Sequence, residues 1–199
     1  LSHLDKFHPQ ETLNSLLDLL NDREREVVVR RFGLRGQEPE TLEKIGGSFQ
    51  ITRERIRQIE RLAIKKLTTD KQALVLIQPI RQVVMDCLEK DGGASARDNF
   101  INQLVKLSSQ VKPQVIGFYL DELLNDVALP LGGAGTRFTI GYRFRAAVID
   151  YLNELHEAAE NWIEEKSSRV SESELIYAIL NKSLKSPLVL TLTAEFLPD

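Results

Sequence analysis

Hydrophobic residues recur at three- and four-residue spacing along most of the chain, which is the pattern of amphipathic helices. In the first seventy residues this spacing predicts helices over residues 12–20, 22–32, 42–49 and 53–67. The predicted inward side chains are Leu13, Leu16, Leu17, Leu20, Val27, Val28, Phe32, Leu42, Ile45 and Phe49. Asn21 with Glu24 fits a capping box, Gly33 is a C-terminal stop, and Thr41 and Thr52 are predicted N-caps. Two helices joined by a tight turn, the second longer, are typical of a helix-turn-helix.

Beyond residue 70 the pattern predicts further helices over residues 80–90, 97–107 and 113–125, with Pro79 in the first turn of the first one. Apolar segments at 127–131 and 137–140 flank a glycine-rich turn and predict a β-hairpin. Helices followed by a hairpin are the element order of a winged helix. Residues 145–166 are predicted to form a long helix with an acidic face, and residues 172–180 a short one.

The predicted fold class is therefore mainly α. We expect a helix-turn-helix domain at residues 1–70, a winged-helix-like domain with a small β-hairpin at 73–143, and a C-terminal helical extension at 144–199. The hairpin offers a second contact surface, for protein or for DNA, through Arg137, Tyr142, Arg143 and Arg145.

The polar face of segment 53–67 carries the candidate chemistry. At about 100° per residue, one face holds Arg53, Glu54, Arg57, Gln58, Arg61 and Lys65, and the other holds Ile56, Ile59, Leu62, Ala63 and Leu67. In the major groove, arginine reads guanine, glutamine reads adenine and glutamate accepts from cytosine. Phosphate contact alone would need only lysine and arginine, so this mixture favours base reading. A solvated surface helix is the alternative interpretation.

The net charge of −3 conceals a local excess of positive charge. Residues 1–70 contain 13 basic and 12 acidic residues, whereas residues 71–199 contain 13 and 17. Within residues 53–66, six basic residues stand against two acidic ones. Positive charge focused on one element is expected where that element meets a polyanion. Double-stranded DNA is therefore the predicted partner.

Several sequence segments also resemble a known family. The segments Leu20–Val27, Arg31–Leu34, Thr41–Gly46 and Thr52–Glu60 resemble region 4 of the primary, sigma-70-type sigma factors of bacterial RNA polymerase. The resemblance covers about residues 12–68 and implies recognition of a promoter −35 element. By motif position it implies that Arg53, Glu54, Arg57 and Gln58 contact bases or lie near them, and that Lys65 contacts phosphate. It further implies that Thr41 and Leu42 offer backbone amides to a phosphate at a helix N-terminus.

The same resemblance implies docking on the β flap of core RNA polymerase, through an apolar surface that Leu13, Leu16, Leu17 and Val28 would line. We favour core positions for most of these four side chains. Residues 78–143 are loosely similar to helix-turn-helix domains of the HARE type, including the polymerase delta subunit. Two alternatives stay open: an operator-binding regulator that never contacts polymerase, and a flap-binding module that does not read DNA.

Other function classes find little support in the sequence. The single cysteine, Cys87, excludes an internal disulfide and a multi-cysteine zinc site, and the three histidines lack metal-ligand spacing. No nucleophile–base arrangement or paired carboxylates point to an enzyme, and we predict no cofactor. No stretch approaches the roughly 18 apolar residues of a membrane span, so we expect no membrane partner and a cytoplasmic location. Because the chain opens with Leu1, we expect a fragment, and a −10-melting region upstream is left open.

Overall fold

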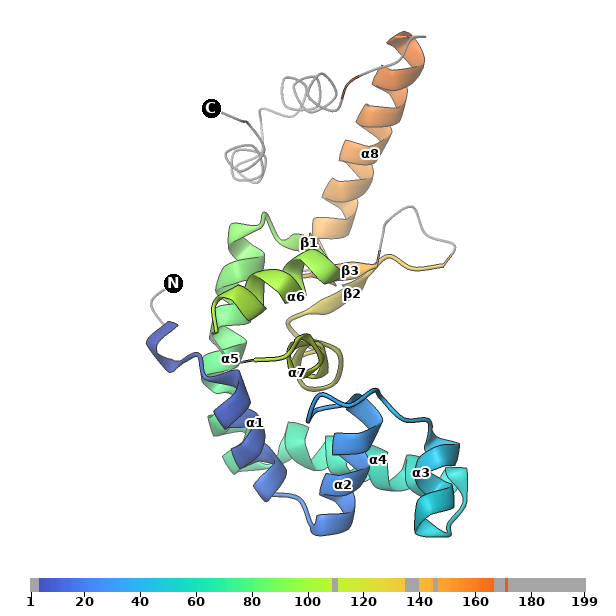
Figure 1. Ribbon diagram of the computed structural model, residues 1–199. Coiled ribbons are helices and arrows are strands. Elements are labelled where there is room, and N and C mark those ends of the chain that lie inside the picture. Colours follow the sequence, from blue (N-terminus) through green and yellow to red (C-terminus); the bar gives the residue numbers. More distant parts are fainter. Residues whose placement is uncertain (1–3, 109–110, 135–139, 145–146, 167–170, 172–199) are drawn as a thin grey trace. The chain divides into compact units, whose positions relative to one another are not determined.

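The computed structural model describes residues 4–108, 111–134, 140–144, 147–166 and 171 (Figure 1). Contacts between Cα atoms divide the chain into two units. The first unit joins Leu1–Met85 to Arg97–Ala128, and the second joins Asp86–Ala96 to Leu129–Asp199. The mainly helical fold with a small sheet is confirmed. The predicted three-domain division and the winged-helix assignment stay predictions.

The first unit begins with a short 3-10 turn, η1 (Leu4–Lys6), and four helices follow it. These are α1 (Pro9–Asp18), α2 (Asp22–Phe32), α3 (Leu42–Phe49) and α4 (Arg53–Thr69). The predicted capping box is present: the Asn21 side chain accepts from the Glu24 amide at 2.9 Å, and the Glu24 carboxylate accepts from the Asn21 amide at 3.0 Å. Thr41 and Thr52 cap α3 and α4 through their hydroxyl oxygens, each at 3.2 Å. Gly33 ends α2 at a φ of 64°, which glycine adopts without a Cβ penalty.

A tight turn joins α3 to α4 and confirms the helix-turn-helix prediction. Gln50 takes the left-handed conformation with a φ of 56°, and the Ile51 amide donates to the Gly46 carbonyl at 3.0 Å. A Cβ on Gly46 would lie 2.8 Å from the Ile51 carbonyl oxygen, closer than carbon and oxygen normally approach. Glycine at this position therefore allows the two helices to meet closely.

Apolar side chains of α2, α3 and α4 form the core that supports the candidate DNA-reading face. Val27, Ile45, Ile56 and Ile59 are buried together, with Leu42, Phe49 and Ile51 packed against them. Ala63 and Leu67 are also buried, as predicted. The prediction for Leu62 is wrong, because its side chain is 57% exposed. It lies about 100° around the helix from the centre of the buried residues, outside the arc that packs.

The prediction of a helix starting at Pro79 is also wrong. The helix α5 runs without interruption from Lys71 to Lys90 and contains Pro79 in its interior. Its start is set by Asp70, whose carboxylate accepts from the Gln72 and Ala73 amides at 2.8 and 3.1 Å. An interior proline costs about 3 kcal/mol. Burial of the helix's apolar stripe offsets that cost; its buried members are Ala73, Ile77, Ile80, Val83, Val84, Cys87 and Leu88.

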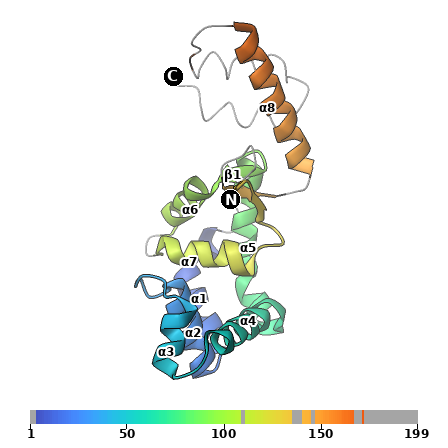
Figure 2. The same cartoon turned by 90° about the vertical axis from the view of Figure 1, so that its right-hand side faces the viewer.

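The first unit is completed by α6 (Arg97–Lys106), α7 (Pro113–Phe118) and a π-helical turn, η2 (Tyr119–Leu123). Figure 2 shows α7 beside the four-helix part, where it contacts α1 and α2, while η2 contacts α4. The buried Tyr119 hydroxyl donates to the Pro9 carbonyl at 2.9 Å. The rings of Phe32 and Phe118 pack with their centroids 4.9 Å apart. Segments far apart in the sequence therefore share one core.

In the second unit, β1 (Ala94–Ala96), β2 (Leu129–Leu131) and β3 (Gly141–Arg143) form an antiparallel sheet in the order β1-β3-β2. The prediction placed the second hairpin strand at residues 137–140. The structure places it at β3, where Tyr142 pairs with Pro130 and Ser95. Residues 135–139 lie outside the described part. Ile140 is exposed, whereas Tyr142 is buried. Burial therefore favours a strand at residues 141–143 over one at residues 137–140.

The long helix α8 (Ala147–Lys166) follows the sheet and matches the predicted helix, apart from residues 145–146, which are not described. The predicted helix at 172–180 also lies outside the described residues. Within the described ranges, no helix combines the length and the apolar composition that a membrane crossing requires.

Candidate nucleic-acid interface

The candidate DNA-reading face of α4 is open to solvent. Six of the eight candidate residues lie on it: Arg53, Glu54, Arg57, Gln58, Arg61 and Lys65, all exposed. The opposite side of the helix is buried in the core described above. The remaining two, Thr41 and Leu42, lie at the start of α3, exposed and half-buried respectively. Core packing on one side and three well-formed N-caps therefore hold a polar surface toward solvent.

An ion pair joins two of these residues on the exposed surface. The Arg57 guanidinium donates to both carboxylate oxygens of Glu54, at 2.7 and 2.8 Å. The bond from Arg57 holds the pKa of the Glu54 carboxyl below its ordinary value, and Glu54 raises the pKa of Arg57. Both side chains remain about half exposed, at 50% and 57%. The pair therefore presents a charged, hydrogen-bonding unit that can be exchanged for partner groups at little cost.

The other candidates differ in whether they already have a partner. Arg53 pairs with Glu43 of α3 at 3.1 Å, and the Gln58 carbonyl oxygen accepts from Arg55 at 3.0 Å. The side chains of Arg61 and Lys65 have no hydrogen-bond or ion-pair partner in the part of the chain that the structure describes. The N-terminal half of the face is therefore self-paired, and the C-terminal half offers unpaired cations.

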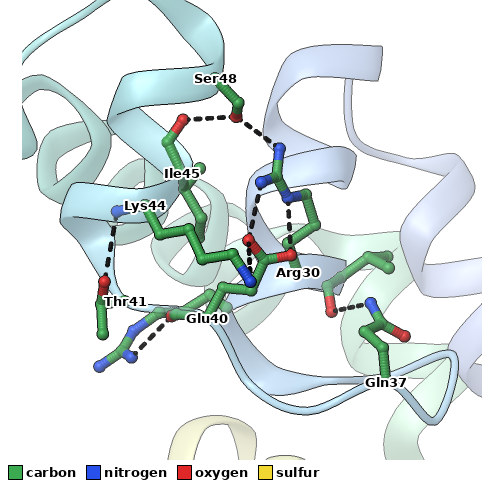
Figure 3. Close-up of polar contacts among 9 residues, drawn as sticks. Arg30, Gln37, Glu40, Thr41, Lys44, Ile45 and Ser48 are labelled. Atoms are coloured by element: carbon green, nitrogen blue, oxygen red, sulfur yellow. Dashed lines mark hydrogen bonds and ion pairs between the residues drawn. The ribbon is translucent and has the colours of Figure 1, made fainter.

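The N-terminus of α3 is fixed by a polar network that the sequence analysis missed (Figure 3). Glu40 accepts from the Arg30 guanidinium at 2.8 and 3.1 Å and lies 3.5 Å from the Lys44 ammonium. Arg30 also donates to the Ser48 hydroxyl at 2.7 Å. These contacts tie α2 to both ends of α3. The amides at Thr41 and Leu42 are thereby held in place beside the reading face.

Electrostatics strengthens this anchor. The hydrogen bond from Arg30 lowers the pKa of Glu40, although burial acts in the opposite direction. The same bond raises the pKa of Arg30. The neighbouring Arg31 donates to the Glu40 carbonyl and to the Glu60 carboxylate, both at 3.2 Å, and so links α2 to α4. No spacing rule detects these pairs, because they form across a loop and between helices.

The residues predicted to line a flap-binding surface lie in the interior. Leu13, Leu16, Leu17 and Val28 are all buried, in the first unit where α7 packs against α1 and α2. This agrees with the core interpretation favoured for most of them. In the hairpin, Tyr142 is buried, so it is not available as a surface contact, and Arg137 and Arg145 lie outside the described residues.

Comparisons with known proteins match part of this chain to one family. Residues 16–68 match the family model of Sigma-70, region 4. The RNA polymerase sigma factor RpoD of Helicobacter pylori is 42% identical over 82 residues, which cover 41% of this chain and 12% of that protein. The sigma factor SigA of Lactococcus lactis subsp. cremoris is 53% identical over 58 residues, covering 29% and 16%. For SigA of Microcystis aeruginosa the identity is 46% over 72 residues, covering 36% and 17%.

The chain thus spans less than a fifth of the length of these curated relatives. Within the matched segments, the family match and the exposed polar face of the second helix point to the same assignment. Residues 16–68 match Sigma-70, region 4, and contain the helix-turn-helix formed by α3 and α4.

Proposed function

We propose that this protein is a bacterial transcription factor that recognises a −35-type promoter element by laying α4 in the major groove. The observation that carries the proposal is the division of α4 into a buried apolar side and an exposed side with arginine, glutamate and glutamine. Those side chains match the hydrogen-bonding groups of base edges, which a purely phosphate-binding surface does not require.

In this proposal the exposed residues have different roles. Arg53, Glu54, Arg57 and Gln58 read bases from the N-terminal half of α4. Arg61 and Lys65 contact the backbone from the C-terminal half. The N-terminus of α3, held by the Arg30–Glu40 pair, directs amides at Thr41 and Leu42 to a phosphate, because a helix N-terminus favours anions.

The proposal extends to RNA polymerase, since the three relatives described above are RNA polymerase sigma factors by name. Because Leu13, Leu16, Leu17 and Val28 are buried, docking on the β flap requires another surface or displacement of the residues that cover them. An operator-binding regulator and a flap-binding module are the alternatives. A cytoplasmic location and a non-catalytic role belong to the same proposal.

Competition binding tests base reading. We expect the full chain to prefer a −35-type duplex over a scrambled duplex of the same composition at moderate salt. Equal affinity for both duplexes would contradict the proposal. Absence of binding at nanomolar protein would not suffice, because non-specific dissociation constants are about 10⁻⁴–10⁻⁶ M.

A pull-down of core polymerase, with and without promoter DNA, separates the alternatives. Capture with DNA selectivity supports the sigma-factor-like role. Selective DNA binding without capture supports the operator-binding regulator, and capture without selective DNA binding supports the flap-binding module.

A further inference from the structure

Beside the C-terminal half of α4, the first unit contains a groove of about 550 Å³ that the family match does not cover completely. One wall consists of α4 residues that include Arg57, Arg61 and Lys65. The opposite wall comes from η2 and the turn after it, through Glu122 and Asn125. These last two residues lie more than fifty positions beyond the matched segment, which ends at residue 68.

Three polar side chains along this groove have no partner. Arg61, Lys65 and Asn125 are exposed, and none of their side chains makes a hydrogen bond or ion pair within the described part of the chain. By contrast, the adjacent Asp126 is held by Arg81 through two bonds of 2.6 and 3.0 Å. Two cations and one amide therefore leave hydrogen-bond donors unused beside the reading face.

The groove also contains carboxylates. Glu60 is bonded to Arg31 at 3.2 Å, so its charge is already compensated. Among the described residues, none forms a hydrogen bond or ion pair with the Glu122 side chain, and burial, with Glu60 and Asp121 nearby, raises the pKa of its carboxyl. The positive charge of Arg31 lowers the pKa of Glu122 and so partly offsets this increase. A carboxylate in this position opposes the approach of a phosphate, while the unpaired donors favour it.

We propose that the DNA backbone follows this groove and that Asn125 donates a hydrogen bond to a phosphate, so that the segment after η2 is part of the DNA interface. The inference rests on the proposed function for duplex binding, and it does not depend on which bases α4 reads. A phosphate matches the donors present: guanidinium, ammonium and amide groups all bind phosphate oxygens. Glu122 limits the affinity because its negative charge lies in the same groove.

The first test compares Asn125→Asp with Asn14→Asp in the full chain. Asn14 is an exposed asparagine on α1 that lines a different groove and has no partner among the described residues. We expect Asn125→Asp to weaken binding to −35-type and scrambled duplexes alike, by about tenfold at 0.1 M salt or below, because a carboxylate replaces a donor beside the phosphates. Asn14→Asp should bind both as the unchanged protein does. Equal binding by the two variants would overturn the proposal.

The second test uses Glu122→Gln, with Glu11→Gln on α1 as the matched control. Removing the carboxylate from the groove should strengthen binding to both duplexes by about two- to fivefold. A misfolded variant cannot produce tighter binding, so this gain is free of the folding ambiguity. Unchanged affinity in Glu122→Gln would overturn the proposal.

The two proposals fail in different ways. If the unchanged protein binds both duplexes equally, base reading fails, while the Asn125 and Glu122 comparisons on the scrambled duplex still test the groove. If Asn125→Asp changes the preference between duplexes rather than the affinity for both, the phosphate role is overturned. If no duplex binds at any accessible concentration, both proposals fail.

Discussion

Replacing Gln58 with alanine tests base reading at a single position. In the free protein, the Gln58 carbonyl oxygen accepts from Arg55 at 3.0 Å on the exposed surface. Water replaces such a bond at small cost, so the helix should fold unchanged. A glutamine paired with adenine through two bonds contributes about 1–3 kcal/mol of discrimination. Its loss corresponds to about 5- to 150-fold in the preference at one base pair.

The assay is competition among duplexes in which each position of the −35-type element carries all four base pairs in turn. Gln58→Ala should lose its preference at one position and keep it at the others. Gln78→Ala, an exposed glutamine of α5, should keep the full profile. If Gln58→Ala retained the preference at every position, glutamine would not be reading a base and the orientation assigned to α4 would be wrong.

Three further predictions follow from the same contacts. Lys65→Ala should weaken all duplexes alike and reduce the slope of log K against log salt by about 0.9, measured by titration at several salt concentrations; an unchanged slope would remove Lys65 from the phosphate contacts. Tyr119→Phe should lower the free energy of unfolding in urea by about 1–3 kcal/mol, because the Pro9 carbonyl loses its buried donor, and an unchanged midpoint would contradict the reported bond. Since burial raises the pKa of Glu122 in the folded state, the stability linked to its proton is complete below the ordinary glutamate pKa and is lost as the pH rises through the raised value. Glu122→Gln should therefore melt at a higher temperature than the unchanged protein at neutral pH and at the same temperature near pH 4; a constant difference across pH would refute the assignment.

Local signals account for the success of the sequence analysis in the first seventy residues. The capping box at Asn21 and Glu24, the stop at Gly33 and the caps at Thr41 and Thr52 depend on residues four or fewer positions apart, and the structure contains all of them. The exposed face of α4 could also be predicted from local sequence, because helical periodicity alone separates its polar and apolar sides.

Long-range packing explains what could not be predicted. Pro79 indicates a helix start by local rules, yet burial on both sides of it sustains one continuous helix, α5. Leu62 is apolar and lies beside the packing arc, but no neighbouring element covers it. The pairing of Arg30 with Glu40 requires the loop after α2 to return to that helix, and hydrophobic periodicity carries no information about that return.

The groove illustrates the same limit for the site itself. Arg61 and Lys65 are predictable from the helical face of α4, since they repeat every four residues along it. Asn125 has no such pattern around it and reaches the groove only because η2 packs against α4. Helical periodicity therefore predicts the two cations, but only the tertiary structure shows that another segment lies beside them.

The bond from Tyr119 to the carbonyl of Pro9 joins positions 110 residues apart. At a synthesis rate of about 5–20 residues per second, the ribosome adds Tyr119 roughly 5–20 seconds after Pro9. During that interval α1 and α2 emerge without α7, which packs against both of them in the folded protein. Completion of the core of the first unit during translation is thus timed by a segment encoded well downstream of its N-terminal helices.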